Sequence, residues 1–289
     1  MTDEVADAAV GAAPDVDDGA RHGTDYDPGV EAAAEHAARE AHGRGALVDS
    51  LRTIAFAFLL ALTLRVVVME PFHIPSASME PALYPGDTIG AAKFPYGWSR
   101  VSTSPIPLPM IAGRVFGRDP RRGDIIVFRN ELDGGADYIK RVVGLPGDRV
   151  QMRGGVLHLN GEAVPTQLVE EHDGADPYGA PVRVSVYEER LPDGCAYHVQ
   201  HFTYPDGRIE GLDDTYVYEV PEGRYFVMGD NRDASYDSRW QGRVGFVPAS
   251  DVIGRAQFVF VSFGANGANG AGRWPNLRGE RTLKTLPCS

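Results

Sequence analysis

The twelve residues EPFHIPSASMEP at positions 70–81 follow the longest apolar run of the chain, and the other motifs are interpreted from them. Three prolines in this stretch fix three φ angles, remove three backbone donors and push each preceding residue toward an extended conformation. We therefore predict a rigid loop, neither a helix nor a regular strand. Ser76 and Ser78 lie between the rigid points, so either hydroxyl is a candidate nucleophile. An ordinary Pro/Ser turn is the alternative.

The apolar run before this loop has the composition of a membrane-spanning helix. Residues 53–69 are apolar around most of the helix circumference, unlike a surface amphipathic helix. Apolar residues from Leu47 onward extend the run toward the roughly 20 residues that a span requires. We predict one transmembrane helix over 47–69, with Arg65 reaching the interface. A buried core helix and a cleaved signal peptide are the alternatives.

The N-terminal segment carries most of the negative charge. Eleven acidic residues and three arginines give residues 1–45 a charge of −8, against −12 for the whole chain. Such a segment has little to bury, so residues 1–46 are predicted to be a disordered tail. Arg39, Arg44 and Arg52 favour a cytoplasmic position for it. The charge balance argues against a nucleic-acid partner.

The composition after the apolar run favours turn-rich β structure. The chain holds 34 Gly and 21 Pro, and hairpin signals stand at Gly154-Gly155 and Asn160-Gly161. We predict a mainly β fold: an antiparallel, barrel-like meander forming one domain over 70–263, with an inserted β-ribbon at about 165–220. Residues 264–289 are predicted to be a flexible tail. The expected strands are 88–93, 124–129, 137–144, 149–153, 156–159, 163–164, 183–188, 196–203, 216–220, 224–228 and 255–263.

The two cysteines, Cys195 and Cys288, exclude a disulfide-dense scaffold and a four-cysteine zinc site. A single bridge between them and a free thiol both stay open. No cofactor is expected.

A serine nucleophile needs a base, because a hydroxyl attacks poorly until its proton is removed. Three of the eight histidines lie in the acidic tail, and the others stand in no motif. Lys140 lies in the middle of a predicted strand, within YIKRVVGLPGD at 138–148, where desolvation would lower its pKa from the ordinary value of about 10.4. An exposed strand lysine paired with a carboxylate is the alternative.

The segments at 70–81 and 138–148, followed by GDNRDASYDSR at 229–239, resemble in this order those of type I signal peptidases. These are membrane-bound serine proteases that remove leader peptides from exported proteins. RGDIIVF at 122–128 and GFVP at 245–248 fit the same family. The resemblance implies a single-pass protein of the bacterial inner membrane, with a cytoplasmic N-terminus and a periplasmic or extracellular catalytic domain. Its implied partners are exported preproteins and the lipid bilayer, whereas an oligomeric state is not indicated.

The same resemblance implies roles for individual residues. Ser78 matches the nucleophile of the family and Lys140 its general base. The backbone N–H of Ser78 and the hydroxyl of Ser76 match the groups that stabilise the oxyanion. Ser235 matches the hydroxyl that orients the lysine amine. Supporting and substrate-pocket positions are matched by Asp237, Arg239, Ile74, Pro75, Met79, Leu83 and Tyr138.

The polar loop at 229–239 also admits a metal-binding interpretation. From Asp233 onward it places Asp, Ser and Asp at alternate positions. It lacks the glycine and the glutamate that an EF-hand loop requires, so no metal site is predicted.

Two other classes of protein share parts of this pattern. A self-cleaving repressor of the Ser-Lys type would need a DNA-binding helix-turn-helix and no membrane helix. A catalytically inactive membrane-anchored β module that binds peptides would not need all the matched catalytic side chains, which are present here.

Overall fold

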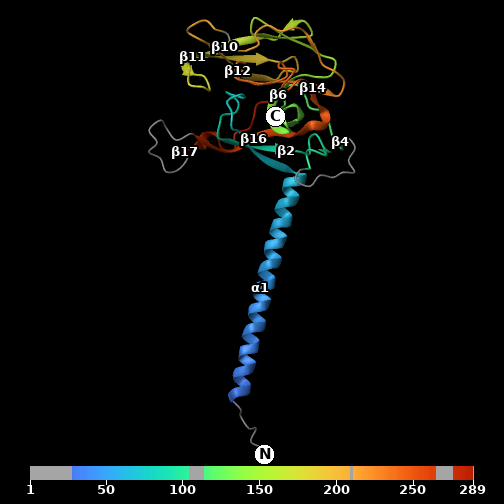
Figure 1. The fold of residues 1–289 in the computed structure, drawn as a ribbon, viewed down its shortest axis with the longest axis vertical. Helices are drawn as coiled ribbons and strands as arrows, with labels where there is room; N and C mark the ends of the chain where they lie inside the picture. The colour runs from blue at the N-terminus through green and yellow to red at the C-terminus, as the bar shows by residue number, and fades with distance from the viewer. Residues whose placement is uncertain (1–27, 104–113, 209–210, 265–275, 289) are drawn as a thin grey trace, which may run out of the picture. The chain divides into compact units, whose positions relative to one another are not determined.

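The protein is described by a computed structural model that covers residues 28–103, 114–208, 211–264 and 276–288 (Figure 1). The chain divides into two compact units, Met1–Ala57 and Phe58–Ser289. The first contains most of one helix, and the second contains all the strands.

Helix α1 (Pro28–Val67) is 40 residues long and begins before the predicted apolar segment. The disorder predicted for 1–46 is therefore wrong for 28–46, because the Ala-rich run there has high helix propensity; residues 1–27 lie outside the described part. Along the second half of α1, large apolar side chains from Leu51 to Leu64 are exposed. Within the described residues, no helix is both long enough and apolar enough to cross a membrane. The span over 47–69 stays a prediction.

The second unit is organised around an eight-stranded sheet in which all neighbouring strands are antiparallel. Its order is β1-β2-β16-β5-β6-β14-β15, and β17 also pairs with β16. Apolar side chains from these strands form the buried core. The bounds are β1 (Met69–His73), β2 (Asp87–Ala92), β5 (Ile125–Asn130), β6 (Ala136–Gly144), β14 (Arg224–Met228), β15 (Val247–Pro248), β16 (Val252–Gly264) and β17 (Asn276–Leu277).

Smaller sheets extend this architecture and confirm a mainly β fold (Figure 1). The four-stranded sheet has the order β13-β7-β8-β9, and its β8–β9 turn uses Asn160 and Gly161 at positive φ, as a two-residue hairpin requires. The ribbon predicted at 165–220 is present as the sheet β10-β11-β12. The bounds are β7 (Arg149–Arg153), β8 (Val156–Leu159), β9 (Glu162–Ala163), β13 (Tyr218–Glu219), β10 (Thr166–Ala175), β11 (Pro181–Arg190), β12 (Ala196–Thr203), β3 (Trp98–Ser99) and β4 (Arg114–Val115), with short 3₁₀ helices at Glu131–Asp133, Ala249–Asp251 and Gly279–Arg281.

The segment at 70–81 is only partly the irregular loop that the prolines predict. Its first residues belong to β1, which pairs with β2 from Met69 to His73. Pro71 is tolerated there because β1 is the edge strand of the sheet, where a missing backbone donor costs no ladder hydrogen bond. The irregular part begins at Ile74.

The C-terminal segment is also more ordered than predicted. Residues 265–275 lie outside the described part, but 276–288 pack along β16. Leu286 is buried in the core, Arg281 forms a buried ion pair with Asp87, and Cys288 forms a disulfide with Cys195. The flexible tail predicted for 264–289 is therefore wrong for 276–288, because the buried contacts of this segment lie far away in sequence.

Candidate active site

Ser78 and Lys140 lie in direct contact, although 62 positions separate them in the sequence. Ser78 stands in the irregular turn after β1, and Lys140 lies in the middle of β6. Lys140 Nζ donates to Ser78 Oγ at 2.7 Å and to the carbonyl oxygen of Ile139 at 2.8 Å. Only 7% of Ser78 and 3% of Lys140 is exposed, so this contact is shielded from bulk water.

The environment of Lys140 favours its neutral amine. Burial lowers the pKa of Lys140 from 10.5 to about 8; the negative charges of Asp237 and Asp230 act against this decrease, and Arg239 adds to it. Within the described residues, no carboxylate lies at ion-pair distance from Nζ. The alternative of an exposed, paired strand lysine is therefore wrong. A buried amine in contact with a hydroxyl can accept that hydroxyl's proton near neutral pH.

Ser76 lies beside this pair, at the solvent-facing side of the turn. Its Oγ is 3.3 Å from Ser78 Oγ, and the residue is exposed. A rotatable hydroxyl in this position can donate to an oxygen that approaches Ser78 from solvent.

Ser235 approaches the pair through the loop after β14. A Cβ atom on Gly229 would lie 2.3 Å from Ser235 Oγ and 2.5 Å from the carbonyl oxygen of Ser78. Glycine is therefore required at 229 for the loop to pack this closely. Ser235 Oγ is buried and makes no hydrogen bond of good geometry within the described residues, but its hydroxyl lies close enough to the Asp237 carboxylate to help lower the pKa of Asp237. The structure thus places the Ser235 hydroxyl near Ser78.

Asp237 and Arg239 form a buried bidentate ion pair under the same loop. Arg239 donates to the two carboxylate oxygens at 2.9 and 2.8 Å and to the carbonyl oxygen of Arg232 at 2.7 Å. Asp237 accepts from the backbone N–H of Gly229 at 2.9 Å. Burial alone would raise the pKa of Asp237, but the charge and hydrogen bonds of Arg239 hold it below its ordinary value. The pair therefore fixes the loop at the point where Gly229 contacts Ser78.

Arg141 is a component of the site that the sequence reasoning missed. It donates to both carboxylate oxygens of Asp230 at 2.8 and 2.7 Å, and both residues are fully buried. Its guanidinium carbon lies 4.1 Å from the centre of the Tyr197 ring. Asn231, next to Asp230, donates its backbone N–H to the Ser78 carbonyl oxygen at 3.2 Å. A second charged residue in a buried strand, directly after Lys140, was the available signal for this pair.

A second buried pair braces the loop from the ribbon. Arg232 donates to Glu189 of β11 at 2.7 Å, and the hydroxyl of Tyr197 donates to the same carboxylate at 2.7 Å. Glu189 and Tyr197 lie in the ribbon at 165–220, so this insertion supports the site directly.

The five predicted pocket residues do not form one group. Ile74, Met79 and Leu83 are buried together in one core cluster. Pro75 is exposed. Tyr138 packs against a different cluster, donates its hydroxyl to Asp133 at 2.9 Å, and has its ring centre 5.6 Å from Lys140 Nζ.

One group of side chains has the composition of a metal site. His201, Asp213 and Asp233 each have a ligand atom within 4.8 Å of the others. Of the three, only Asp233 belongs to the polar loop at 229–239, which lacks the EF-hand residues. Burial, with the positive charges nearby, lowers the pKa of His201 to about 4, and burial raises that of Asp233 to about 6. The residues could ligate a cation, but acidic clusters are common without one.

The family model and the curated relatives indicate one family. The family model described as signal peptidase, peptidase S26, matches residues 47–261. A signal peptidase I of Rickettsia typhi is 39% identical over 217 residues, which cover 73% of this chain and 78% of that protein. The signal peptidase I of Rickettsia prowazekii is also 39% identical, with the same coverage. A solved signal peptidase I from Enterococcus faecalis is 28% identical, covers 48% of this chain and 97% of its own, and has a TM-score of 0.27.

Proposed function

The chain belongs to the signal peptidase family, peptidase S26, and from this premise we propose that it cleaves signal peptides from exported preproteins with Ser78 as nucleophile and Lys140 as general base. The family membership makes it a serine peptidase of the signal peptidase I type. The observation that carries the proposal is the 2.7 Å contact between a buried lysine amine and a buried serine hydroxyl.

The reaction begins when Lys140 Nζ removes the proton from Ser78 Oγ as Oγ attacks the scissile carbonyl carbon. The negative charge that develops on the carbonyl oxygen is stabilised by the Ser78 N–H and the Ser76 hydroxyl. Lys140, now an ammonium, donates its proton to the leaving amine as the C–N bond breaks, which leaves an ester on Ser78. Water then loses a proton to Lys140, attacks the ester and releases the carboxylic acid, while Ser78 recovers its proton.

Three further side chains keep this pair in register. Ser235 orients the amine of Lys140 through its buried hydroxyl. Asp237 and Arg239 hold the loop that brings Ser235 to the site. These are positioning roles, since none of the three touches the scissile bond.

The substrate pocket is shallow and accepts small side chains before the cut. Ile74, Met79 and Leu83 supply its apolar floor; their burial in one core cluster supports this, because a packed floor resists a large side chain. Pro75 and Tyr138 line its rim.

The protein is anchored in the bacterial inner membrane through residues 47–69, with the N-terminus cytoplasmic and the catalytic domain over 70–263 on the outer side. The exposed apolar side chains of α1 support a lipid-facing role. The Cys195–Cys288 disulfide supports the outer side, because disulfides persist in oxidising compartments. Labelling of engineered cysteines in intact cells tests this orientation: a reagent that cannot cross the membrane should label a cysteine at the exposed position Ser250 and not one at Ala33, which is exposed in the N-terminal segment.

Cleavage of an exported precursor by the purified full chain tests the function itself. The product should begin at the residue after a small side chain, and Ser78→Ala should abolish its formation. Ser250→Ala, at an exposed serine outside the site, is the matched control and should cleave like the wild type. Cleavage of the chain itself without precursor processing would favour the self-cleaving class, and no cleavage of either would favour the inactive peptide-binding module.

A further inference from the structure

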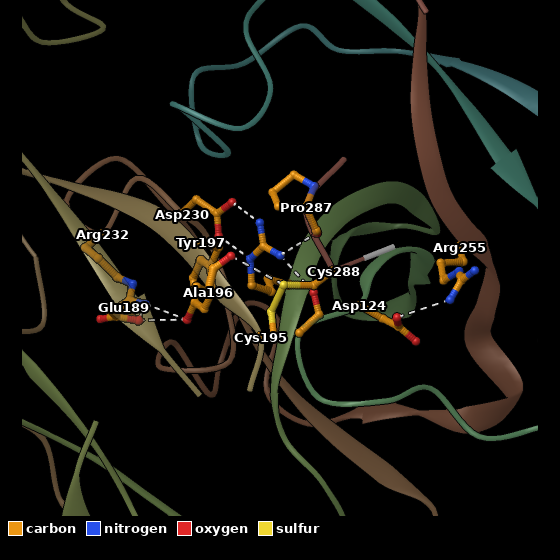
Figure 2. Close-up of a disulfide and its surroundings, with 12 residues drawn as sticks. Asp124, Glu189, Cys195, Ala196, Tyr197, Asp230, Arg232, Arg255, Pro287 and Cys288 are labelled. Atoms are coloured by element: carbon orange, nitrogen blue, oxygen red, sulfur yellow. Dashed lines mark hydrogen bonds and ion pairs between the residues drawn. A yellow bond between two sulfur atoms is a disulfide. The ribbon is translucent and has the colours of Figure 1, made fainter. Parts of the chain in front are cut away.

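The disulfide joins the ribbon to the C-terminal segment (Figure 2). Cys195 lies in the turn between β11 and β12 of the ribbon, and Cys288 lies near the end of the C-terminal segment. Figure 2 shows Asp230, Tyr197 and Pro287 around the sulfur atoms. The bond therefore fastens the C-terminal segment to the ribbon beside a carboxylate of the site.

The C-terminal segment behaves as an added strand on β16. The N–H of Leu283 donates to the carbonyl oxygen of Val259 at 2.7 Å, and the N–H of Leu286 donates to that of Gln257 at 2.9 Å. Leu286 packs in the same core cluster as Met79 and Ile74. The disulfide holds the end of this segment in place beyond its last core residue.

The disulfide packs directly on the backbone that holds Arg141. A Cβ atom on Gly123 would lie 2.5 Å from Cys195 Sγ, so only glycine, here at φ +93°, leaves room for the bond. The carbonyl oxygen of Gly123 accepts from Arg141 at 2.8 Å, and that of Pro287, next to Cys288, lies 3.5 Å from the same nitrogen. The disulfide thus lies against both of these acceptors of Arg141: Gly123 is also held by its N–H, which donates to the Val142 carbonyl oxygen at 2.7 Å, whereas Pro287 directly precedes Cys288.

Arg141 connects the two members of the proposed dyad. It follows Lys140 in β6 and forms an ion pair with Asp230. The next residue, Asn231, donates its backbone N–H to the Ser78 carbonyl oxygen. A shift of Arg141 therefore moves Lys140 and Ser78 relative to one another.

We propose that the Cys195–Cys288 disulfide is a positioning element of the active site: it holds Arg141 in place and helps to exclude water from Lys140. The oxidised chain is therefore the competent enzyme. This inference rests on the proposed function. A cavity of about 870 Å³ is lined by both cysteines, and both are half-buried, so water and a reductant reach the bond. When the bond opens, the last residues are free to leave Arg141, and water enters beside the buried Arg141–Asp230 pair.

The consequence for Lys140 has a defined sign. The charged groups that act on its amine are Asp237 and Asp230, which favour the ammonium, and Arg239, which opposes it; the Tyr138 ring lies on the remaining side. Burial is the largest influence and depresses the pKa of Lys140. Added hydration therefore raises this pKa and reduces the fraction of neutral amine at pH 7.

The test compares the oxidised and reduced full chain over a range of pH. These cysteines are the only two in the sequence, so a phosphine reductant has no other disulfide to act on. We expect reduction to lower precursor cleavage at pH 7 by about fivefold or more and to move the pH profile upward. The variant carrying Cys195→Ala and Cys288→Ala should show the reduced profile with or without reductant. A reduced chain, verified by mass, with an unchanged pH profile would overturn the proposal, even if it melts at a lower temperature.

Hydrogen exchange separates this inference from the proposed function. If the oxidised chain cleaves no precursor, the proposed function fails, and exchange in peptides that cover Arg141 and residues 229–235 decides the positioning. Faster exchange in both peptides upon reduction supports the disulfide as their brace. Unchanged exchange refutes it.

Discussion

Replacing Lys140 by arginine separates a general base from a structural cation. Arginine keeps the positive charge and much of the length, so an ion-pair or packing role should partly survive. It does not lose its proton in proteins, so a base role should not survive. We expect Lys140→Arg to be as inactive as Lys140→Ala, with a loss of roughly a thousandfold or more, because nucleophile and base act as one unit.

The pH dependence of the wild type supplies the magnitude. With a pKa of about 8, the amine of Lys140 is neutral in about one molecule in eleven at pH 7, in half at pH 8 and in about ten of eleven at pH 9. Cleavage should therefore rise roughly tenfold between pH 7 and pH 9. A lysine at the ordinary pKa of 10.5 would be neutral in only about three molecules in ten thousand at pH 7, and its rate would still be rising at pH 9.

The assay is single-turnover cleavage of a precursor peptide in detergent, with far-UV circular dichroism to verify that each variant is folded. The combination of Ser78→Ala with Lys140→Ala should be no less active than either change alone. Cleavage by Lys140→Arg above a few per cent of the wild type would refute the dyad. So would a wild-type profile that does not level off by about pH 9.

Four further outcomes follow from other contacts. Gly229→Ala should reduce cleavage at least tenfold, because its methyl would lie 2.3 Å from the buried Ser235 hydroxyl. The control Gly242→Ala adds a methyl in open space and should leave cleavage unchanged. Equal activities of the two variants would contradict the close packing of the loop. Arg141→Met should lower the free energy of unfolding by about 3–5 kcal/mol in urea titrations, because it leaves the Asp230 carboxylate buried without its partner. Adding Asp230→Leu should restore part of the lost stability. An additive loss in the double variant would contradict a mutually dependent pair. Lys140→Met should raise the free energy of unfolding at pH 7 by up to about 3 kcal/mol. The pKa of Lys140 is lower in the folded than in the unfolded chain, so the stability of the wild type rises between about pH 8 and pH 10.5. The extra stability of the variant should therefore disappear over that range, which urea titrations at several pH values would measure. A precursor with Ala before the cut should be processed, and the same precursor with Phe should not; comparable rates would rule out a shallow pocket.

Local sequence patterns determined the class of the fold and most of its strands. Alternation, β-branched runs and Gly-containing turns act over a few residues, so 149–153, 156–159, 196–203 and 224–228 agree with observed strands to the residue. The same locality identified the 70–81 segment and the polar loop at 229–239. It failed where a residue's role depended on position within the sheet: Pro71 reads as a loop residue, yet it lies in a strand because β1 is an edge.

The candidate residues were named from the sequence, but their surroundings were not. Burial of Lys140 was inferred from its apolar neighbours, and the structure shows it. The Arg141–Asp230 pair was missed because the two residues lie 89 positions apart and each has an ordinary alternative, as a surface strand cation and a turn carboxylate.

Only the tertiary structure decided that the C-terminal segment is ordered and that the two cysteines form a disulfide. The sequence left the two cysteines open and gave the C-terminal segment no local reason to be ordered. Its order comes from Leu286 in the core, from Arg281 on Asp87 and from a disulfide that spans 93 positions. Such contacts depend on which distant segments the folded sheet brings together, so local patterns in the sequence do not predict them.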